Sequence, residues 1–195
     1  MIATMRSASP FPRSPIFWGE ISPCEHAVQI YGDDGMFIGA LEGFIGGALA
    51  NGESAIAIAT PSHLAALEAR LEARGIDLVA ARHDERYVGV PAERLLGDFM
   101  VDGWPDEERF LEVVTTLINR VRRDGRRVRA FGEMVALLWA QGHAAATVRL
   151  EHLWNKLCSR ERFPLFCAYP KAGFTSDPTR SLRELCAAHS RVFYG

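Results

Sequence analysis

The residues that could do chemistry stand first at a strand-to-helix junction in the stretch RAFGEMVALLWAQG, residues 129–142. Arg129 and Glu133 flank a glycine where the apolar residues change from strand-like to helical spacing. A glycine turn lets a ligand approach the backbone and a helix N-terminus adds amide donors, so this pair could orient a polar ligand. The structural alternatives are that Glu133 only complements the helix dipole, and that Arg129 only pairs with Glu133 or another acid.

Further polar side chains stand at the ends of expected strands or along one expected helix. His26 begins a strand and Tyr31 ends it, while Glu151 and Asn155 are spaced to share one face of a helix. Core packing is the alternative for the histidine, and a position at the rim of a cleft is the alternative for the tyrosine. The predicted ligand-binding set is His26, Tyr31, Asp33, Arg129, Glu133, Glu151, Asn155 and Tyr169.

We expect the binding site at the carboxyl edge of the sheet, because ligands bind there in open parallel sheets. The carboxylate of Glu133 is expected to orient a polar ligand, or to hold Arg129 so that Arg129 does so. Trp154 and Leu150 are expected to be core residues rather than the wall of a cofactor site. The side chains expected to form a cleft with Glu133 are His26, Tyr31, Arg129 and Tyr169.

Cysteine and histidine also occur in two short segments. Thiolates and imidazoles are zinc ligands, and two of each could make a closed tetrahedral site if the segments meet. The C-x-H spacing is unusual for a zinc finger and nothing in the sequence forces the segments together, so we expect neither a metal nor a cofactor. If a metal is present, the expected ligands are Cys24, His26, Cys186 and His189.

Patterns typical of catalysis are absent from the sequence. It contains no G-x-S-x-G, no H-E-x-x-H and no phosphate loop with its lysine, so we expect no catalytic residues and no tight binding or hydrolysis of ATP. Cys167 stands in a strand that looks buried, and packing is a better interpretation than a nucleophile. The sequence therefore favours a protein that is not an enzyme.

Composition and charge limit the partners. The chain has 195 residues and a formal net charge of −2, without a lysine and arginine block long enough to follow phosphates, so nucleic acid is not expected as a direct partner. The longest apolar stretch is too short for a membrane span, and no signal peptide is recognisable. We expect a cytoplasmic protein with a flexible leader at 1–16 and one domain at 17–193.

Apolar runs of strand length alternate with helical patterns along the chain, which predicts an α/β fold with a mostly parallel sheet flanked by helices. A loop is expected from residue 101 onward, before the helix at 106. The expected strands cover 26–31, 54–60, 78–81, 87–90, 127–131 and 164–169. The expected helices cover 36–52, 61–74, 91–100, 106–123, 133–141, 144–159 and 178–189.

Several ordered motifs, spread over nearly the whole chain, together resemble the MEDS domain, the DcmR-type sensory domain of methanogens and methylotrophs. The resemblance implies a RecA/KaiC-like three-layer sandwich with a degenerate phosphate loop, a sensor of simple hydrocarbon derivatives. It also implies output partners such as histidine kinases, PAS modules or DNA-binding domains. The motifs are PCEHAVQIYGDDGMFIGALEGFI, VRAFGEMVALLWAQG, RLEHLWNKL, LFCAYP and CAAHSRV.

The function expected from residues and resemblance is a non-catalytic input domain of a signalling system that binds a small ligand. One alternative is a RecA-like nucleotide binder or an enzyme with an atypical phosphate loop. The other is a protein-interaction module of a signalling complex. The oligomeric state stays open, with a homodimer among the options.

Overall fold

The computed structural model describes residues 18–19, 21–174, 183, 185 and 187–194. The predicted leader at 1–16 and most of the helix predicted at 178–189 lie outside these described residues. The limits of the predicted single domain, 17–193, therefore stay a prediction.

A six-stranded parallel sheet runs through the described chain in the order β3-β2-β6-β7-β1-β8. Its inner strands are buried on both faces, which explains their continuous apolar runs in the sequence. The predicted fold class is confirmed. The strands are β1 (His26–Tyr31), β2 (Ser54–Ala59), β3 (Tyr87–Pro91), β6 (Val128–Gly132), β7 (Leu165–Pro170) and β8 (Arg191–Tyr194).

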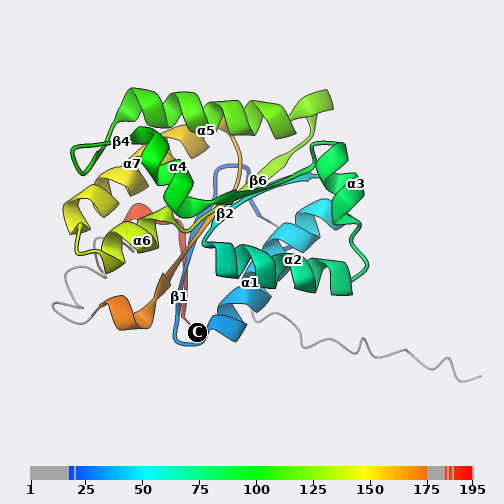
Figure 1. Cartoon of the computed structure of the whole chain (residues 1–195), viewed down its shortest axis with the longest axis horizontal. Helices are drawn as coiled ribbons and strands as arrows, with labels where there is room; N and C mark the ends of the chain where they lie inside the picture. Colours follow the sequence, from blue (N-terminus) through cyan, green and yellow to red (C-terminus); the bar gives the residue numbers. More distant parts are fainter. Residues whose placement is uncertain (1–17, 20, 175–182, 184, 186, 195) are drawn as a thin grey trace, which may run out of the picture.

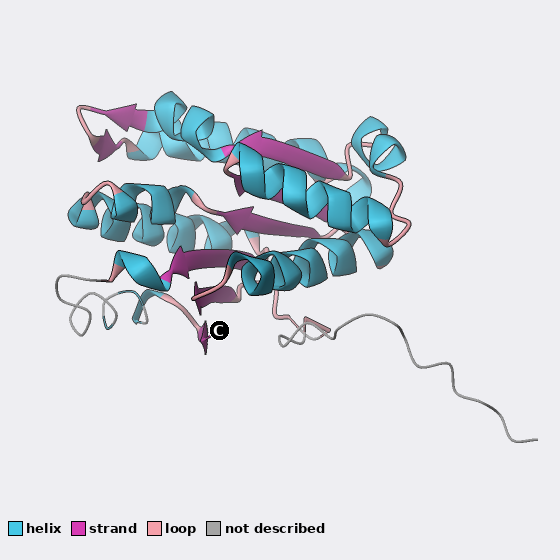
Figure 2. Cartoon of the chain, turned by 60° about the horizontal axis from the view of Figure 1, so that its bottom comes forward, coloured by secondary structure: helices cyan, strands magenta, loops and turns pink. Residues whose placement is uncertain are grey.

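Helices cover both faces of the sheet and so make three layers (Figure 1). The first three helices pack on one face and the next four on the other, and the long arrows of the sheet point the same way in Figure 2. Among the described residues, none of the helices is both long and apolar enough to cross a membrane. The helices are α1 (Asp34–Ala50), α2 (Pro61–Ala73), α3 (Leu78–His83), α4 (Ala92–Phe99), α5 (Glu107–Val121), α6 (Met134–Ala140) and α7 (Ala144–Glu161).

Short polar residues begin the helices that follow the strands. The Asp33 carboxylate accepts from the N–H of Met36 at the start of α1, and the Thr60 hydroxyl accepts from the N–H of His63 at the start of α2. Gly75, with a φ of +80°, follows the end of α2 in the left-handed region that favours glycine. These local signals agree with the predicted helix boundaries.

Two predictions about secondary-structure elements need correction, and one strand was missed. The strand predicted at 78–81 is the helix α3, because the Asp77 carboxylate caps it and accepts from the N–H of Ala80. The loop predicted from 101 onward contains part of a small antiparallel hairpin, β4 (Met100–Val101) with β5 (Trp104–Pro105). β8 was not predicted at all, although it pairs with β1.

Candidate functional site

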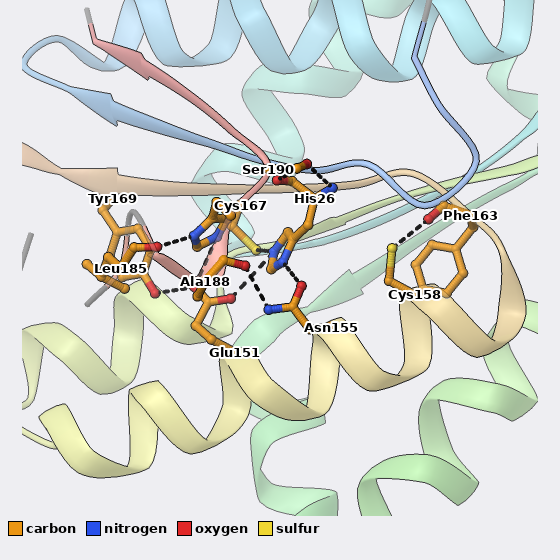
Figure 3. Close-up of polar contacts among 11 residues, drawn as sticks. His26, Glu151, Asn155, Cys158, Phe163, Cys167, Tyr169, Leu185, Ala188 and Ser190 are labelled. Atoms are coloured by element: carbon orange, nitrogen blue, oxygen red, sulfur yellow. Dashed lines mark hydrogen bonds and ion pairs between the residues drawn. The ribbon is translucent and has the colours of Figure 1, made fainter. Parts of the chain in front are cut away.

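The first candidate site lies between the sheet and α7 (Figure 3). Side chains alternate between the faces of a strand, and this alternation turns His26 of β1, with Cys167 and Tyr169 of β7, toward α7. The i, i+4 spacing of α7 turns Glu151 and Asn155 toward the same strands. Residues far apart in the sequence therefore meet on one face of the sheet.

Four side chains form what we call the buried cluster: His26, Glu151, Cys167 and His189. Their candidate ligand atoms all lie within 4.8 Å of one another. His26 Nε2 lies 3.3 Å from Cys167 Sγ and 3.5 Å from Glu151 Oε2. His189 Nε2 lies 3.5 Å from Glu151 Oε1. Glu151 is only 1% exposed and Cys167 is 0% exposed, so these donors face one another inside the protein.

Hydrogen bonds at the outer ring nitrogens orient both imidazoles. Asn155 Nδ2 donates to Ala188 O over 2.7 Å, so Asn155 Oδ1 is left to accept from His26 Nδ1, which lies 2.8 Å away. His189 Nδ1 donates to Leu185 O over 2.6 Å. Each Nδ1 is thus engaged outside the cluster, and in a neutral imidazole this leaves Nε2 with a lone pair that faces the cluster.

Burial shifts the pKa of three cluster residues, His26, Glu151 and Cys167, in the direction that favours their neutral forms. It is the main cause that lowers the pKa of His26 well below its usual value, and the neighbouring His189 lowers it further. Burial likewise raises the pKa of the Glu151 carboxyl and, more strongly, that of the Cys167 thiol. The pKa shifts of His26 and Glu151 therefore both disfavour an ion pair between them.

Part of the cluster is not satisfied by hydrogen bonds. The Tyr169 hydroxyl donates to Glu151 Oε1 over 2.5 Å. Glu151 Oε2 and His189 Nε2 are buried and find no hydrogen-bond partner among the described residues. An unpaired buried polar group costs about 1–3 kcal/mol, so this arrangement is expensive for a site that only packs.

These side chains resemble two kinds of site, a catalytic thiol site and a binding site. Cys167, His26 and Asn155 make a thiol, imidazole and amide relay like that of some cysteine hydrolases. Cys167 is, however, fully buried, and its raised pKa keeps it a thiol, whereas a nucleophile needs an accessible thiolate. Nitrogen, sulfur and oxygen donors that converge without access for a substrate are better suited to binding.

The second candidate site lies at the carboxyl ends of β2 and β6. Glu133 directly precedes α6 as its N-cap residue. Its carboxylate accepts from the N–H of Thr60 over 2.8 Å and bonds His63 Nδ1 over 2.7 Å. The hydrogen bond to Glu133 raises the pKa of His63, more than partial burial lowers it. Both oxygens of Glu133 are thus engaged, and the Glu133–His63 pair ties the start of α2 to the end of β6.

Tyr31 belongs to the surroundings of this second site. Its ring stacks on Phe37 with the centroids 4.6 Å apart, and Phe37 meets the His63 ring edge-on at 5.0 Å. Burial raises the pKa of Tyr31, and the charge of Glu133 adds to the effect. Tyr31 therefore lies with Glu133, as predicted, but apart from the buried cluster.

Arg129 does not lie with Glu133. Its Nε donates to Glu53 Oε2 over 2.6 Å, and its Nη1 donates to Trp18 O over 3.4 Å. The prediction that Glu133 holds Arg129 toward a ligand is wrong, because Arg129 lies near the start of β6 and Glu133 follows its end. Arg129 is 4% exposed and pairs with another acid, the structural alternative.

The conditional metal set is brought together only in part. His26 and His189 converge, but Cys24 is exposed, and Cys186 lies outside the described residues. The missed member is Cys167, which the sequence analysis interpreted as packing. A signal was present, since Cys167 and Tyr169 are two residues apart on one strand and so share a face.

The predicted ligand-binding set therefore divides between separate places. Half of it surrounds the buried cluster: His26, Glu151, Asn155 and Tyr169. The remainder lies elsewhere, as Tyr31 near Glu133, Arg129 on Glu53, and Asp33 as the cap of α1. The predicted cleft of Glu133 with His26, Arg129 and Tyr169 is not formed.

Comparisons with known proteins show the family to which the chain belongs. Curated proteins give no match. Among solved structures, the chain is similar to an uncharacterized protein, PH0321 of Pyrococcus horikoshii, crystallised in complex with an unknown peptide, with a TM-score of 0.58, 14% identity, and coverage of 86% of this chain and 76% of that one. At this identity the likeness shows the fold alone. The model of the methanogen/methylotroph, DcmR sensory domain matches residues 25–190, and the chain therefore belongs to this MEDS family.

Proposed function

We propose that this chain is a non-catalytic input domain of a signal-transduction system, and that it binds a small polar ligand or ion in the buried cluster. Its membership of a sensory-domain family supports the signalling role. One observation supports the location: Glu151 Oε2 and His189 Nε2 are buried and lack hydrogen-bond partners among the described residues. A ligand between them satisfies both atoms and recovers the cost of burying them unpaired.

The route of the signal is the segment 187–194, because it contacts both the cluster and β1. His189 lies in the cluster, and Ser190 N–H donates to His26 O over 2.8 Å. The N–H of His26 donates back to Ser190 Oγ over 3.0 Å, and β8 then pairs with β1. A ligand held by both histidines favours the docked state of this segment, and an output partner such as a histidine kinase or a PAS protein reads that state.

The carboxyl edge of the sheet, where the sequence analysis placed the ligand, has less support. Both oxygens of Glu133 already bond groups of the protein, so neither is left without a partner for a ligand to satisfy. Simple hydrocarbon derivatives, the ligands implied by the family resemblance, fit the buried cluster only through a polar head group, since its converging atoms are nitrogen, oxygen and sulfur.

Nucleotide binding, the alternative from another class, has less support still. The Asp33 carboxylate occupies the N–H of Met36 at the start of α1, with an O···N distance of 2.9 Å. A phosphate needs such amides, and a carboxylate in their place repels it. The RecA/KaiC-like interpretation of the fold therefore carries no expectation of ATP binding for this chain.

Native mass spectrometry of gently purified protein tests the proposal. We expect a bound mass on the wild type that is lost in Glu151→Gln and retained in the matched variant Glu133→Gln. Hydrogen exchange across 187–194 is expected to be slower in the ligand-bearing protein than in the stripped protein. The reverse pattern of loss between the two variants, or no bound mass together with equal exchange, would overturn it.

A further inference from the structure

We infer that the occupant of the buried cluster is one divalent transition-metal ion, Zn²⁺ by preference, held by His26 Nε2, His189 Nε2, Cys167 Sγ and a Glu151 carboxylate oxygen. This inference deepens the proposed function and rests on it for the role of the ion in signalling. The binding site itself rests on the geometry of the four side chains.

The donor atoms already lie near the spacing of a tetrahedral site. Bonds of about 2.0–2.3 Å from Zn²⁺ to nitrogen, oxygen and sulfur place neighbouring donors about 3.3–3.8 Å apart. His26 Nε2 lies 3.3 Å from Cys167 Sγ and 3.5 Å from Glu151 Oε2, within that range. His189 Nε2 lies 3.5 Å from Glu151 Oε1, and no pair of donors is more than 4.8 Å apart. Small side-chain movements are enough to close the site.

The groups behind the donors are those expected behind metal ligands. A metal-bound imidazole donates its other N–H to a carbonyl or carboxylate, which sets the ring orientation. His26 Nδ1 has the Asn155 amide oxygen for this role and His189 Nδ1 has Leu185 O. The Tyr169 hydroxyl supports the Glu151 carboxylate in the same way. The Nε2 atoms of both histidines are thereby left to face the cluster.

Charge balance also favours a dication. A thiolate from Cys167 and a carboxylate from Glu151 carry two negative charges, which cancel those of Zn²⁺, while both imidazoles bind as neutral ligands. Binding displaces the thiol proton, together with any proton on the carboxyl, into solvent, so the buried complex carries no net charge. A monovalent ion would leave net charge in the core, which is costly.

The donor types select among dications. Mg²⁺ and Ca²⁺ take oxygen ligands, whereas this site offers only one carboxylate beside two nitrogens and a sulfur. Mixed nitrogen and sulfur ligands suit Zn²⁺, and Co²⁺ adopts the same tetrahedral geometry with visible spectra. A purely structural hydrogen-bond network does not explain why Glu151 Oε2 and His189 Nε2 lack partners among the described residues.

The test uses the full chain, stripped with a chelator, and Zn²⁺ or Co²⁺ alone as probes. We expect about one ion per chain, and with Co²⁺ a thiolate-to-metal charge-transfer band and the intense visible bands of tetrahedral coordination. Cys167→Ser removes the charge-transfer band. His189→Gln lowers the affinity by more than about 100-fold, beyond the effect of outer-shell partners.

Matched variants separate a lost ligand from a disturbed fold. Cys158 is another buried thiol, whose Sγ contacts Phe163 O instead of the cluster, so Cys158→Ser keeps the band and the affinity. His63→Gln is the control for His189→Gln. If His189→Gln does not fold, the comparison of the Co²⁺ charge-transfer band in Cys167→Ser and Cys158→Ser tests the metal site alone. Wild type without stoichiometric metal, or a Co²⁺ band that survives Cys167→Ser, would overturn the inference.

The outcomes also distinguish this inference from the proposed function. An organic mass in the cluster without metal removes the inference and leaves the sensory role standing. Stoichiometric metal that leaves hydrogen exchange of 187–194 unchanged keeps the metal site and removes its role in signalling. In the result we expect, one ion binds and the same titration slows exchange in that segment.

Discussion

The Glu133–His63 pair at the carboxyl ends of β2 and β6 differs from the buried cluster in how its carboxylate is satisfied. Glu133 accepts from the backbone of Thr60 and bonds His63, so both of its oxygens are used. Glu151 uses one oxygen for the Tyr169 hydroxyl, and the other has no hydrogen-bond partner among the described residues. Since both glutamates are buried, the difference lies in the bonding and not in the exposure.

Position in the fold alone does not identify the binding site of this protein. The Glu133–His63 pair stands where ligands of parallel sheets usually bind, yet it joins two elements of the protein itself. The buried cluster lies between the sheet and α7, and two of its polar atoms have no hydrogen-bond partner among the described residues. The Glu133–His63 pair joins α2 to the end of β6, whereas the buried cluster has the unpaired polar atoms expected of a site that a ligand completes.

The largest expected effect is the contrast between Glu151→Gln and Glu133→Gln in Zn²⁺ affinity. Glu151→Gln is expected to lower the affinity by more than about 100-fold, because it removes an anionic ligand. Without metal, its stability is expected to change by less than about 1 kcal/mol, since burial disfavours the charged form of the Glu151 carboxyl and an amide has the same shape. Calorimetric titration measures the Zn²⁺ affinity of both variants. Equal affinities would show that the buried cluster is not the metal site.

Asn155→Ala is expected to weaken Zn²⁺ binding by about 10–100-fold, the usual effect of losing an outer-shell partner. Asn155 bonds both His26 Nδ1 and Ala188 O, so its loss frees the imidazole to rotate. The Co²⁺ charge-transfer band should remain, because Cys167 is untouched. Loss of that band, or an unchanged affinity, would contradict the assigned orientation of His26.

Glu133→Gln is expected to lower the free energy of unfolding by about 1–2 kcal/mol, since it replaces a charge-assisted hydrogen bond to His63 by a neutral one. The amide oxygen still accepts from Thr60, so the loss is partial. Urea denaturation measures it, with the exposed Asp124→Asn as a control that changes stability by less than about 0.5 kcal/mol. A variant as stable as wild type would show that the Glu133–His63 pair does not stabilise the fold.

The smallest expected effect is a pH dependence of stability carried by His63. Its hydrogen bond to Glu133 raises its pKa above the usual value of about 6.5, so protonated His63 stabilises the fold. That contribution is complete below about pH 6.5 and is lost as the pH rises through the raised pKa. We expect His63→Gln to flatten the fall in unfolding free energy over that window. Parallel pH profiles of wild type and variant would exclude the pair as the cause.

Much of the sheet could be predicted because its signals are local. SAIAIA, the whole of β2, is a continuous apolar run followed by the helix-starting Thr60 and Pro61. Leu78–Ala81 could not be assigned in this way, because an apolar run of that length suits a strand or a buried helix turn equally. The Asp77 cap decides it for α3. β8 is too short to stand out and is defined by pairing with β1.

The site could be predicted only in parts, for a similar reason. The spacing of Glu151 and Asn155 predicts a shared helix face, and the structure places both toward His26. That β1 and β7 are neighbours depends on the order of strands in the sheet, which no local pattern reveals. Without that order, Cys167 has the pattern of an ordinary core residue.

In the proposed function, the buried cluster receives the signal and the Glu133–His63 pair does not. Hydrogen exchange of β8, followed while Zn²⁺ is added to the chelator-stripped chain, tests it most directly. We predict that one equivalent slows exchange of the β8 amides in wild type and in Glu133→Gln, and leaves them unchanged in Glu151→Gln. Slowing that persists in Glu151→Gln, or that is lost in Glu133→Gln, would contradict the account.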